Sequence, residues 1–185
     1  MRPERAGPAD PKDHDADPET VARVICLRLL TGRAHTRAEL AKALRKRGVE
    51  DDVSARLLDR FDEVGLIDDA AFAGQWVRSR HQQSGLGRRA IAAELYRKGV
   101  DREVAAQALA EVDPESERRT ARELIERRLR TLRVDGPGER AKAGQRLLGM
   151  LARRGYPSGV ATEVVRAALA EHGAEDEELG PADLG

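Results

Sequence analysis

Several common residue types and segments are scarce or missing in this chain of 185 residues. Only 3% of the residues are aromatic, so any core is built from leucine, valine, isoleucine and alanine. Cys26 is the single cysteine and lies among apolar residues, which excludes an intrachain disulfide and favours a buried thiol. No apolar run approaches the roughly 20 residues of a membrane span, and no signal segment is evident. We therefore expect a cytoplasmic protein without a membrane partner.

Catalytic motifs are also missing from the sequence. The four histidines are scattered and none has a cysteine or paired carboxylate at metal-ligand spacing: His14, His35, His81 and His172. The two Gly-X-Gly runs, at 85–87 and 136–138, continue neither as a dinucleotide fingerprint nor as a phosphate loop. The paired acids Asp68 and Asp69 are explained more simply by a helix N-cap than by a metal site. The sequence predicts no enzyme, no cofactor, no metal and no small-molecule substrate.

A pattern centred on glycine occurs three times, at Gly48, Gly99 and Gly155. Leucine stands four residues before each glycine, an apolar residue follows it directly, and further apolar residues follow at helical spacing. An aspartate upstream marks the start of another helix in each copy, at Asp17, Asp68 and Asp113. Self-similarity at a period near 50 residues indicates tandem helical units.

The repeats predict an all-α fold of three tandem three-helix repeats that form an elongated, curved array. Such stacking implies that no unit buries its apolar face alone. The expected boundaries are a disordered acidic tail over 1–16, repeats over 17–67, 68–112 and 113–170, and a second disordered acidic tail over 171–185.

A net charge of zero conceals an uneven distribution. Residues 1–19 hold three bases and six acids, and residues 171–185 hold six acids and no base. Thirty bases and twenty-one acids remain between them, so the helical body is basic. A basic body predicts a polyanionic or acidic partner, with tails that either compete for the basic face or are only solvated ends.

Nine basic residues are the candidates for contacting that partner. Helical spacing turns Arg89 and Arg97 away from the core residues Ile91 and Leu95. Arg80 lies at the edge of the buried stripe. The complete candidate set is Arg78, Arg80, Arg88, Arg89, Arg97, Lys98, Arg119, Arg127 and Arg130.

The last three of these candidates each follow a glutamate. Glu115, Glu123 and Glu126 each stand four residues before one of them, and this spacing predicts that the three arginines support their helix more than they bind. Glu94 is expected to serve Lys98 in the same way.

The central segment resembles a known family. Residues 66–80 read LIDDAAFAGQWVRSR, followed by GRRAI at 87–91 and ELYRKGV at 94–100, and this combination is similar to the central repeat of the RecX family. Residues 39–49 and 148–156 are similar to its first and third repeats. The resemblance runs from about Pro18 to Leu169 and leaves both tails outside. Tyr156-Pro157 departs from the Gly-Phe that the family often shows.

The resemblance implies a non-enzymatic regulator of the RecA recombinase in homologous recombination, DNA repair and the SOS response. Such a protein binds RecA as a monomer or in the groove of its DNA filament, and restrains filament growth, ATP hydrolysis and strand exchange. Weak direct binding to DNA and a monomeric state are also expected. The alternatives are an autonomous nucleic-acid-binding protein of tandem helix-turn-helix-like units and an inert helical scaffold.

Overall fold

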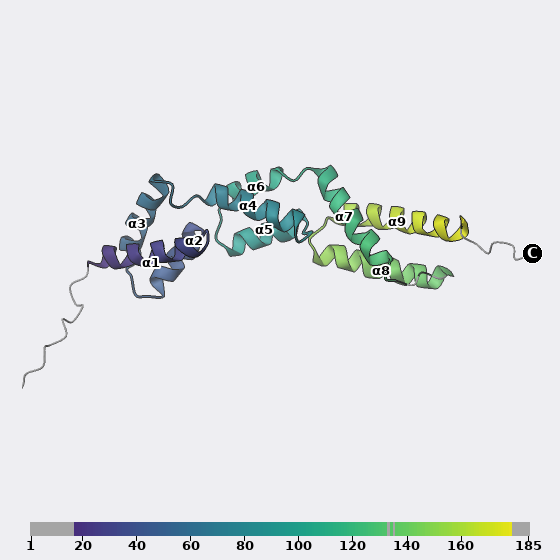
Figure 1. The fold of residues 1–185 in the computed structure, drawn as a ribbon, viewed down its shortest axis with the longest axis horizontal. Coiled ribbons are helices and arrows are strands. Elements are labelled where there is room, and N and C mark those ends of the chain that lie inside the picture. The colour runs from purple at the N-terminus through teal and green to yellow at the C-terminus, as the bar shows by residue number, and fades with distance from the viewer. Residues whose placement is uncertain (1–16, 133, 135, 179–185) are drawn as a thin grey trace, which may run out of the picture. The chain divides into compact units, whose positions relative to one another are not determined.

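The computed structural model describes residues 17–132, 134 and 136–178, and within them it has nine α-helices and no strand (Figure 1). This confirms the expected all-α class. The first three are α1 (Pro18–Gly32), α2 (Arg37–Arg45) and α3 (Asp51–Glu63). The next three are α4 (Asp69–Gln82), α5 (Arg88–Arg97) and α6 (Arg102–Ala110). The last three are α7 (Pro114–Leu129), α8 (Gly136–Arg153) and α9 (Ser158–Glu178).

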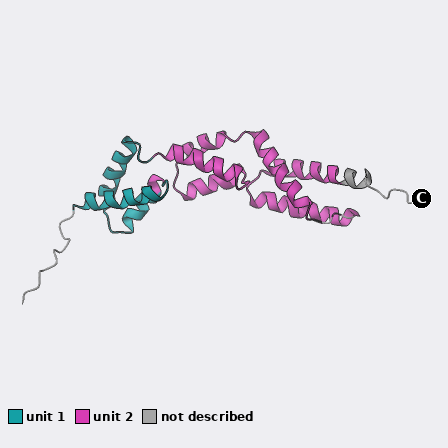
Figure 2. Cartoon of the chain, viewed as in Figure 1, with its two compact units in different colours: residues 1–35, 39–67 teal, residues 36–38, 68–185 magenta. Residues whose placement is uncertain are grey.

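The chain divides into two compact units, coloured separately in Figure 2. Unit 1 comprises residues 1–35 and 39–67, and unit 2 comprises residues 36–38 and 68–185. Unit 2 therefore contains both the second and the third three-helix repeat. The expected N-terminal tail over 1–16 lies outside the described residues, as do 179–185. Helix α9 runs to Glu178, so the backbone of 171–178, which we expected in the C-terminal tail, is helical.

Each repeat has an apolar cluster of its own. In the first repeat α1 packs against α3, in the second α4 packs against α5 and α6, and in the third α9 packs against α7 and α8. The largest buried side chains include Leu40 and Leu44 in the first cluster, Ile91 and Leu95 in the second and Leu147 in the third. Each cluster draws its buried residues from one repeat, and Tyr156 of the third cluster also contacts the second repeat through Gly85.

The repeated glycine ends the second helix of every repeat in a left-handed conformation. The φ angles are 76° at Gly48, 76° at Gly99 and 82° at Gly155. In each repeat the residue after the glycine donates its N–H to the carbonyl of the leucine that lies four residues before the glycine, with N–O distances of 3.1–3.2 Å. These are the bonds of a Schellman motif, which satisfies carbonyls that the helix leaves unpaired and brings the two apolar residues together. The leucine and the following apolar residue are therefore part of the same turn.

Aspartate caps start two of the three repeats as expected. Asp68 Oδ1 accepts the Ala71 N–H and Asp113 Oδ1 accepts the Ser116 N–H, both at 2.7 Å. The bond from Ser116 also lowers the pKa of the Asp113 carboxyl. Asp17 precedes α1, but its carboxylate accepts the Thr20 hydroxyl instead of a backbone N–H. It holds the predicted position without making the predicted cap.

Polar groups join the second and third repeats inside unit 2. Gly87 donates its N–H to Arg154 O (2.8 Å), and Arg154 Nη1 donates to Ser84 O (2.6 Å). The buried Tyr156 hydroxyl donates to Gly85 O (3.1 Å). This junction therefore depends on hydrogen bonds aimed at the loop between α4 and α5.

Helix α5 also receives its N-terminal acceptor from the third repeat. Its N-cap is Gly87, which has no side chain, and its first turn has no acid. The Glu117 carboxylate of α7, 4% exposed, accepts the Arg88 N–H at 3.0 Å. A negative charge at this end of α5 complements the helix dipole, so a residue of one repeat caps a helix of another.

Comparing Gly155→Ala with Gly48→Ala tests the junction. Both changes place a Cβ on left-handed backbone, which costs about 1–2 kcal/mol. A Cβ at Gly155 would also collide with the backbone of Ala90, whereas one at Gly48 meets nothing within 4 Å. We expect Gly155→Ala to cost a further amount of about 1–3 kcal/mol in urea denaturation. Equal losses would contradict the close packing of Gly155 on α5.

Tyr156 predicts a pH dependence at alkaline pH. Burial and, to a lesser degree, the Glu117 carboxylate raise its pKa to about 12. An unfolded tyrosine ionises near pH 10, so above about pH 10 the unfolded chain releases a proton that the native chain retains. The free energy of unfolding should therefore fall as the pH rises from about 10 to 12, and Tyr156→Phe should flatten this fall. The matched control is Tyr96→Phe, at an exposed ring, and an unchanged slope in Tyr156→Phe would refute the prediction.

Candidate functional site

Arg89 and Arg97 lie on the outer face of α5, as helical spacing predicts. Both side chains are exposed, as is Ala93 between them, whereas Ile91 and Leu95 are fully buried. Neither arginine has a carboxylate within ion-pair distance among the described residues. Arg88, at the start of α5, is half-buried and its backbone is engaged by Glu117. The outer face of α5 thus presents two cations that no acid of the described chain neutralises.

Three other candidates of the second repeat are committed to contacts inside it. Arg78 Nη1 pairs with Glu111 at 3.0 Å. Arg80 Nε lies 2.9 Å from Glu94 Oε2, although not aligned for a hydrogen bond, and its guanidinium covers the Trp76 ring at 4.4 Å. Lys98 Nζ lies over the same ring at 4.3 Å. Arg80 therefore pairs with an acid at the core edge, and these cations stabilise the repeat.

Trp76 is the centre of that cluster. Its ring stacks on Phe72 with centroids 5.6 Å apart and planes 13° apart, and its Nε1 donates to Glu94 Oε2 at 2.8 Å. Glu94 was expected to serve Lys98, but it holds Trp76 and Arg80 instead. A tryptophan with a bonded N–H and a cation over its ring is a packing element, so it is not available for stacking on nucleic-acid bases.

Two candidate arginines, Arg119 and Arg127, lie on α7, and a third, Arg130, is its C-cap. All three are exposed, and none makes the ion pair that the sequence predicted. Glu115 lies 3.9 Å from Arg118, which also contacts Glu163 of α9 at 3.4 Å. Arg119 donates to Ser116 Oγ, and Arg127 donates to the backbone oxygen of Glu123. Over the described part of the chain, no ion pair forms between Arg119, Arg127 or Arg130 and the glutamates proposed for them. These side chains are consequently freer for a partner than the sequence indicated.

Two of these arginines line a polar hollow at the repeat junction. The hollow, of about 410 Å³, brings Arg119 and Arg127 beside Arg154 and the buried His81. His81 Nδ1 faces Leu86 O at 3.1 Å, so this nitrogen carries the proton, and Nε2 faces the hydroxyls of Ser116 and Thr120 at 3.2 Å. Because both nitrogens are occupied, His81 has a structural role. No group of metal-ligating side chains occurs in the residues that the structure describes.

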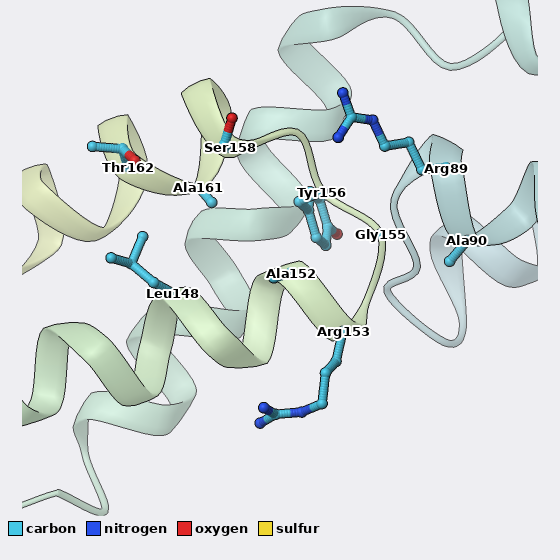
Figure 3. Close-up of a pocket in the computed structure, with 10 residues that line it drawn as sticks. All are labelled: Arg89, Ala90, Leu148, Ala152, Arg153, Gly155, Tyr156, Ser158, Ala161 and Thr162. Carbon is cyan, nitrogen blue, oxygen red and sulfur yellow. The ribbon is translucent and has the colours of Figure 1, made fainter.

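A second, more apolar hollow lies where α5, α8 and α9 meet, and Figure 3 shows its lining. Its volume is about 560 Å³. Arg89 lies at its edge on α5, and Arg153 lines it from α8 with a side chain that points away from Tyr156 in this view. The remaining lining residues are Ala90, Leu148, Ala152, Gly155, Tyr156, Ser158, Ala161 and Thr162. The fold thus places one predicted binding residue at the edge of a concave surface.

Sequence reasoning missed the residues that build this region. Glu117, Arg153, Arg154 and Tyr156 were not candidates, because each contact joins segments well separated in the chain. Glu117 and Arg88 are 29 residues apart, and Arg154 and Ser84 are 70 apart. Helical periodicity reports the face on which a residue lies and carries no signal for such pairs.

Comparison with protein families identifies two of the repeats. Residues 22–61 match the model of the first three-helix domain of RecX, and residues 68–109 match that of the second. These ranges cover α1–α3 and α4–α6 almost entirely. In the described residues, no helix is long and apolar enough to cross a membrane.

Curated relatives and solved structures agree with this assignment. The chain is 55% identical to regulatory protein RecX of Mycolicibacterium smegmatis, over 88% of this chain and 90% of that protein. It is 51% identical to regulatory protein RecX of Streptomyces coelicolor, over 89% of this chain and 86% of that protein. The crystal structure of RecX from Lactobacillus salivarius superposes with a TM-score of 0.73 at 20% identity, over 82% of this chain and 97% of that one, and so supports the fold.

Three observations point to the same family: the sequence motif around Asp68 and Gly99, the two matched three-helix domains, and the extent of the identity. The chain belongs to the RecX family of regulatory proteins.

Proposed function

We propose that this protein binds the RecA recombinase, as a monomer or in its filament on DNA, and restrains filament growth, ATP hydrolysis and strand exchange. It acts in the cytoplasm as a monomer and without catalysis of its own. Its contacts are the nine basic residues named above, of which the exposed arginines contribute most. The proposal rests on membership of a family of regulatory proteins and on the charge of the surface.

The observation that carries the proposal is the presence of exposed arginines without ion pairs on α5, on α7 and at the C-cap of α7. Arg89 and Arg97, and likewise Arg119, Arg127 and Arg130, are exposed and have no ion pair among the described residues. A partner's carboxylates or phosphates would therefore gain favourable contacts without first breaking an ion pair inside the protein. By contrast, Arg78 and Arg80 would have to leave Glu111 and Glu94.

The same arginines also favour a second candidate function, autonomous binding to nucleic acid. Contacts to several phosphates would make that binding fall steeply as salt rises, and it would need no RecA. A regulator of RecA should instead require the recombinase even at low salt. Stacking of bases from single-stranded nucleic acid on aromatic side chains is disfavoured, because Phe72 is buried and Trp76 is held between cations.

Charge reversal on α5 tests the binding surface. The double change Arg89→Glu and Arg97→Glu should raise the concentration needed for half-inhibition of DNA-dependent ATP hydrolysis by RecA about tenfold or more. The helical circular dichroism spectrum and the melting temperature should stay close to wild type, because both side chains point away from the core. Arg88 is left unchanged, since a glutamate there would face Glu117.

The control carries the same charge change elsewhere in unit 2. Arg102→Glu with Arg146→Glu alters two exposed arginines outside the candidate set and should inhibit like wild type. Equal inhibition by the α5 variant and wild type would exclude this face. A wild-type protein without effect on RecA at any ratio would exclude the proposed function, and salt-sensitive binding to DNA alone would favour the alternative.

A further inference from the structure

The hollow between α5, α8 and α9 has an apolar lining that the fold leaves uncovered. Leu148 and Ala152 come from α8, Ala161 and Thr162 come from α9, and the Tyr156 ring lies between them (Figure 3). Ala152 and Thr162 are exposed, whereas Tyr156 and Ala161 are 3% exposed. The surface thus combines fixed walls with an accessible mouth, as in sites that accept a side chain.

The walls of the hollow are held in place by the junction of the repeats. Tyr156 is fixed through its bond to Gly85 O, and Gly155 packs directly against Ala90. The bond from Gly87 N–H to Arg154 O ties the start of α5 to the end of α8. Because these contacts are made between residues of the protein itself, they fix the walls independently of a ligand, and such preorganisation favours affinity.

The charge of the lining residues indicates which kind of ligand the hollow would bind. Arg89 is exposed at the edge of the hollow, whereas the exposed Arg153 side chain points away from it toward Gly149 (Figure 3). The other polar side chains of the lining are the hydroxyls of Ser158 and Thr162. No carboxylate belongs to the lining. An occupant with an apolar side chain and neighbouring negative charges would therefore match both the floor and the rim.

We propose that this hollow docks an acidic protein segment that inserts one bulky apolar side chain between α8 and α9, while a flanking carboxylate pairs with Arg89. The inference rests on the proposed function, in that the segment belongs to the regulated recombinase. A DNA strand fits less well. Its phosphates would match the arginines, but the floor is aliphatic and the single aromatic ring in it is buried, so a base has little surface on which to stack.

Filling the hollow from an exposed position tests the proposal without changing charge. Ala152→Trp and, separately, Thr162→Trp place a large ring in the mouth and should raise the half-inhibitory concentration for RecA ATP hydrolysis about tenfold. Ala106→Trp, at an exposed site of α6, is the matched control and should inhibit like wild type. Two filling variants on different helices guard against one that fails to fold, as judged by circular dichroism.

A peptide probe separates failure of the docking site from failure of the proposed function. In heteronuclear NMR of the wild-type protein, a synthetic pentapeptide with a central phenylalanine flanked by aspartates should shift the amide signals of Ala152 and Thr162. A glycine-centred peptide and an oligothymidine strand should not. If the peptide binds but the wild-type protein has no effect on ATP hydrolysis by RecA, the proposed function is overturned and the acidic-segment site is retained. Inhibition unaffected by either filling variant, or shifts caused by the oligothymidine and not by the peptide, would overturn the docking proposal.

Discussion

The left-handed turn that ends the second helix of every repeat is the constraint on which the rest of the structure depends. A helix leaves its last carbonyls unpaired, and here the turn satisfies them through the N–H groups of the glycine and of the apolar residue after it. The turn needs two things: a glycine that adopts the left-handed backbone conformation, and a leucine with an apolar partner that closes the turn over the core. The third helix of each repeat can begin only where this turn directs it.

Gly155 adds a second consequence to the same turn. The space left by its missing side chain is occupied by Ala90, so the end of α8 meets the start of α5. Different interactions stabilise the repeats and the junction between them. Apolar clusters stabilise each repeat separately, while Glu117, Arg154 and Tyr156 orient the third repeat on the second through bonds to backbone groups. Arg89 and Arg153 border one hollow because of these polar contacts.

The sequence predicted the features whose signals are local. The helices, the glycine turns and the Asp68 and Asp113 caps depend on residues within a few positions of one another, and the outward face of Arg89 and Arg97 follows from the helical period alone. The arginine pairs of α7 were predicted incorrectly, since an acid one turn away is only one of the available partners. Arg118 instead reaches Glu163 on α9. Glu117 could not be anticipated as the cap of α5, because nothing in the sequence aligns α7 with that helix end.

The separate cores and the single tryptophan together determine what spectroscopy will report about this molecule. Trp76 is the only tryptophan in the chain, and its indole is enclosed by Phe72, Arg80, Lys98 and Glu94, all within the second repeat. Its emission is therefore a local signal from the packing of α4 on α5, whereas far-ultraviolet ellipticity sums over every helix. A melting curve followed by fluorescence and one followed by ellipticity describe different parts of the same chain, and their coincidence or separation measures how strongly the repeats unfold together.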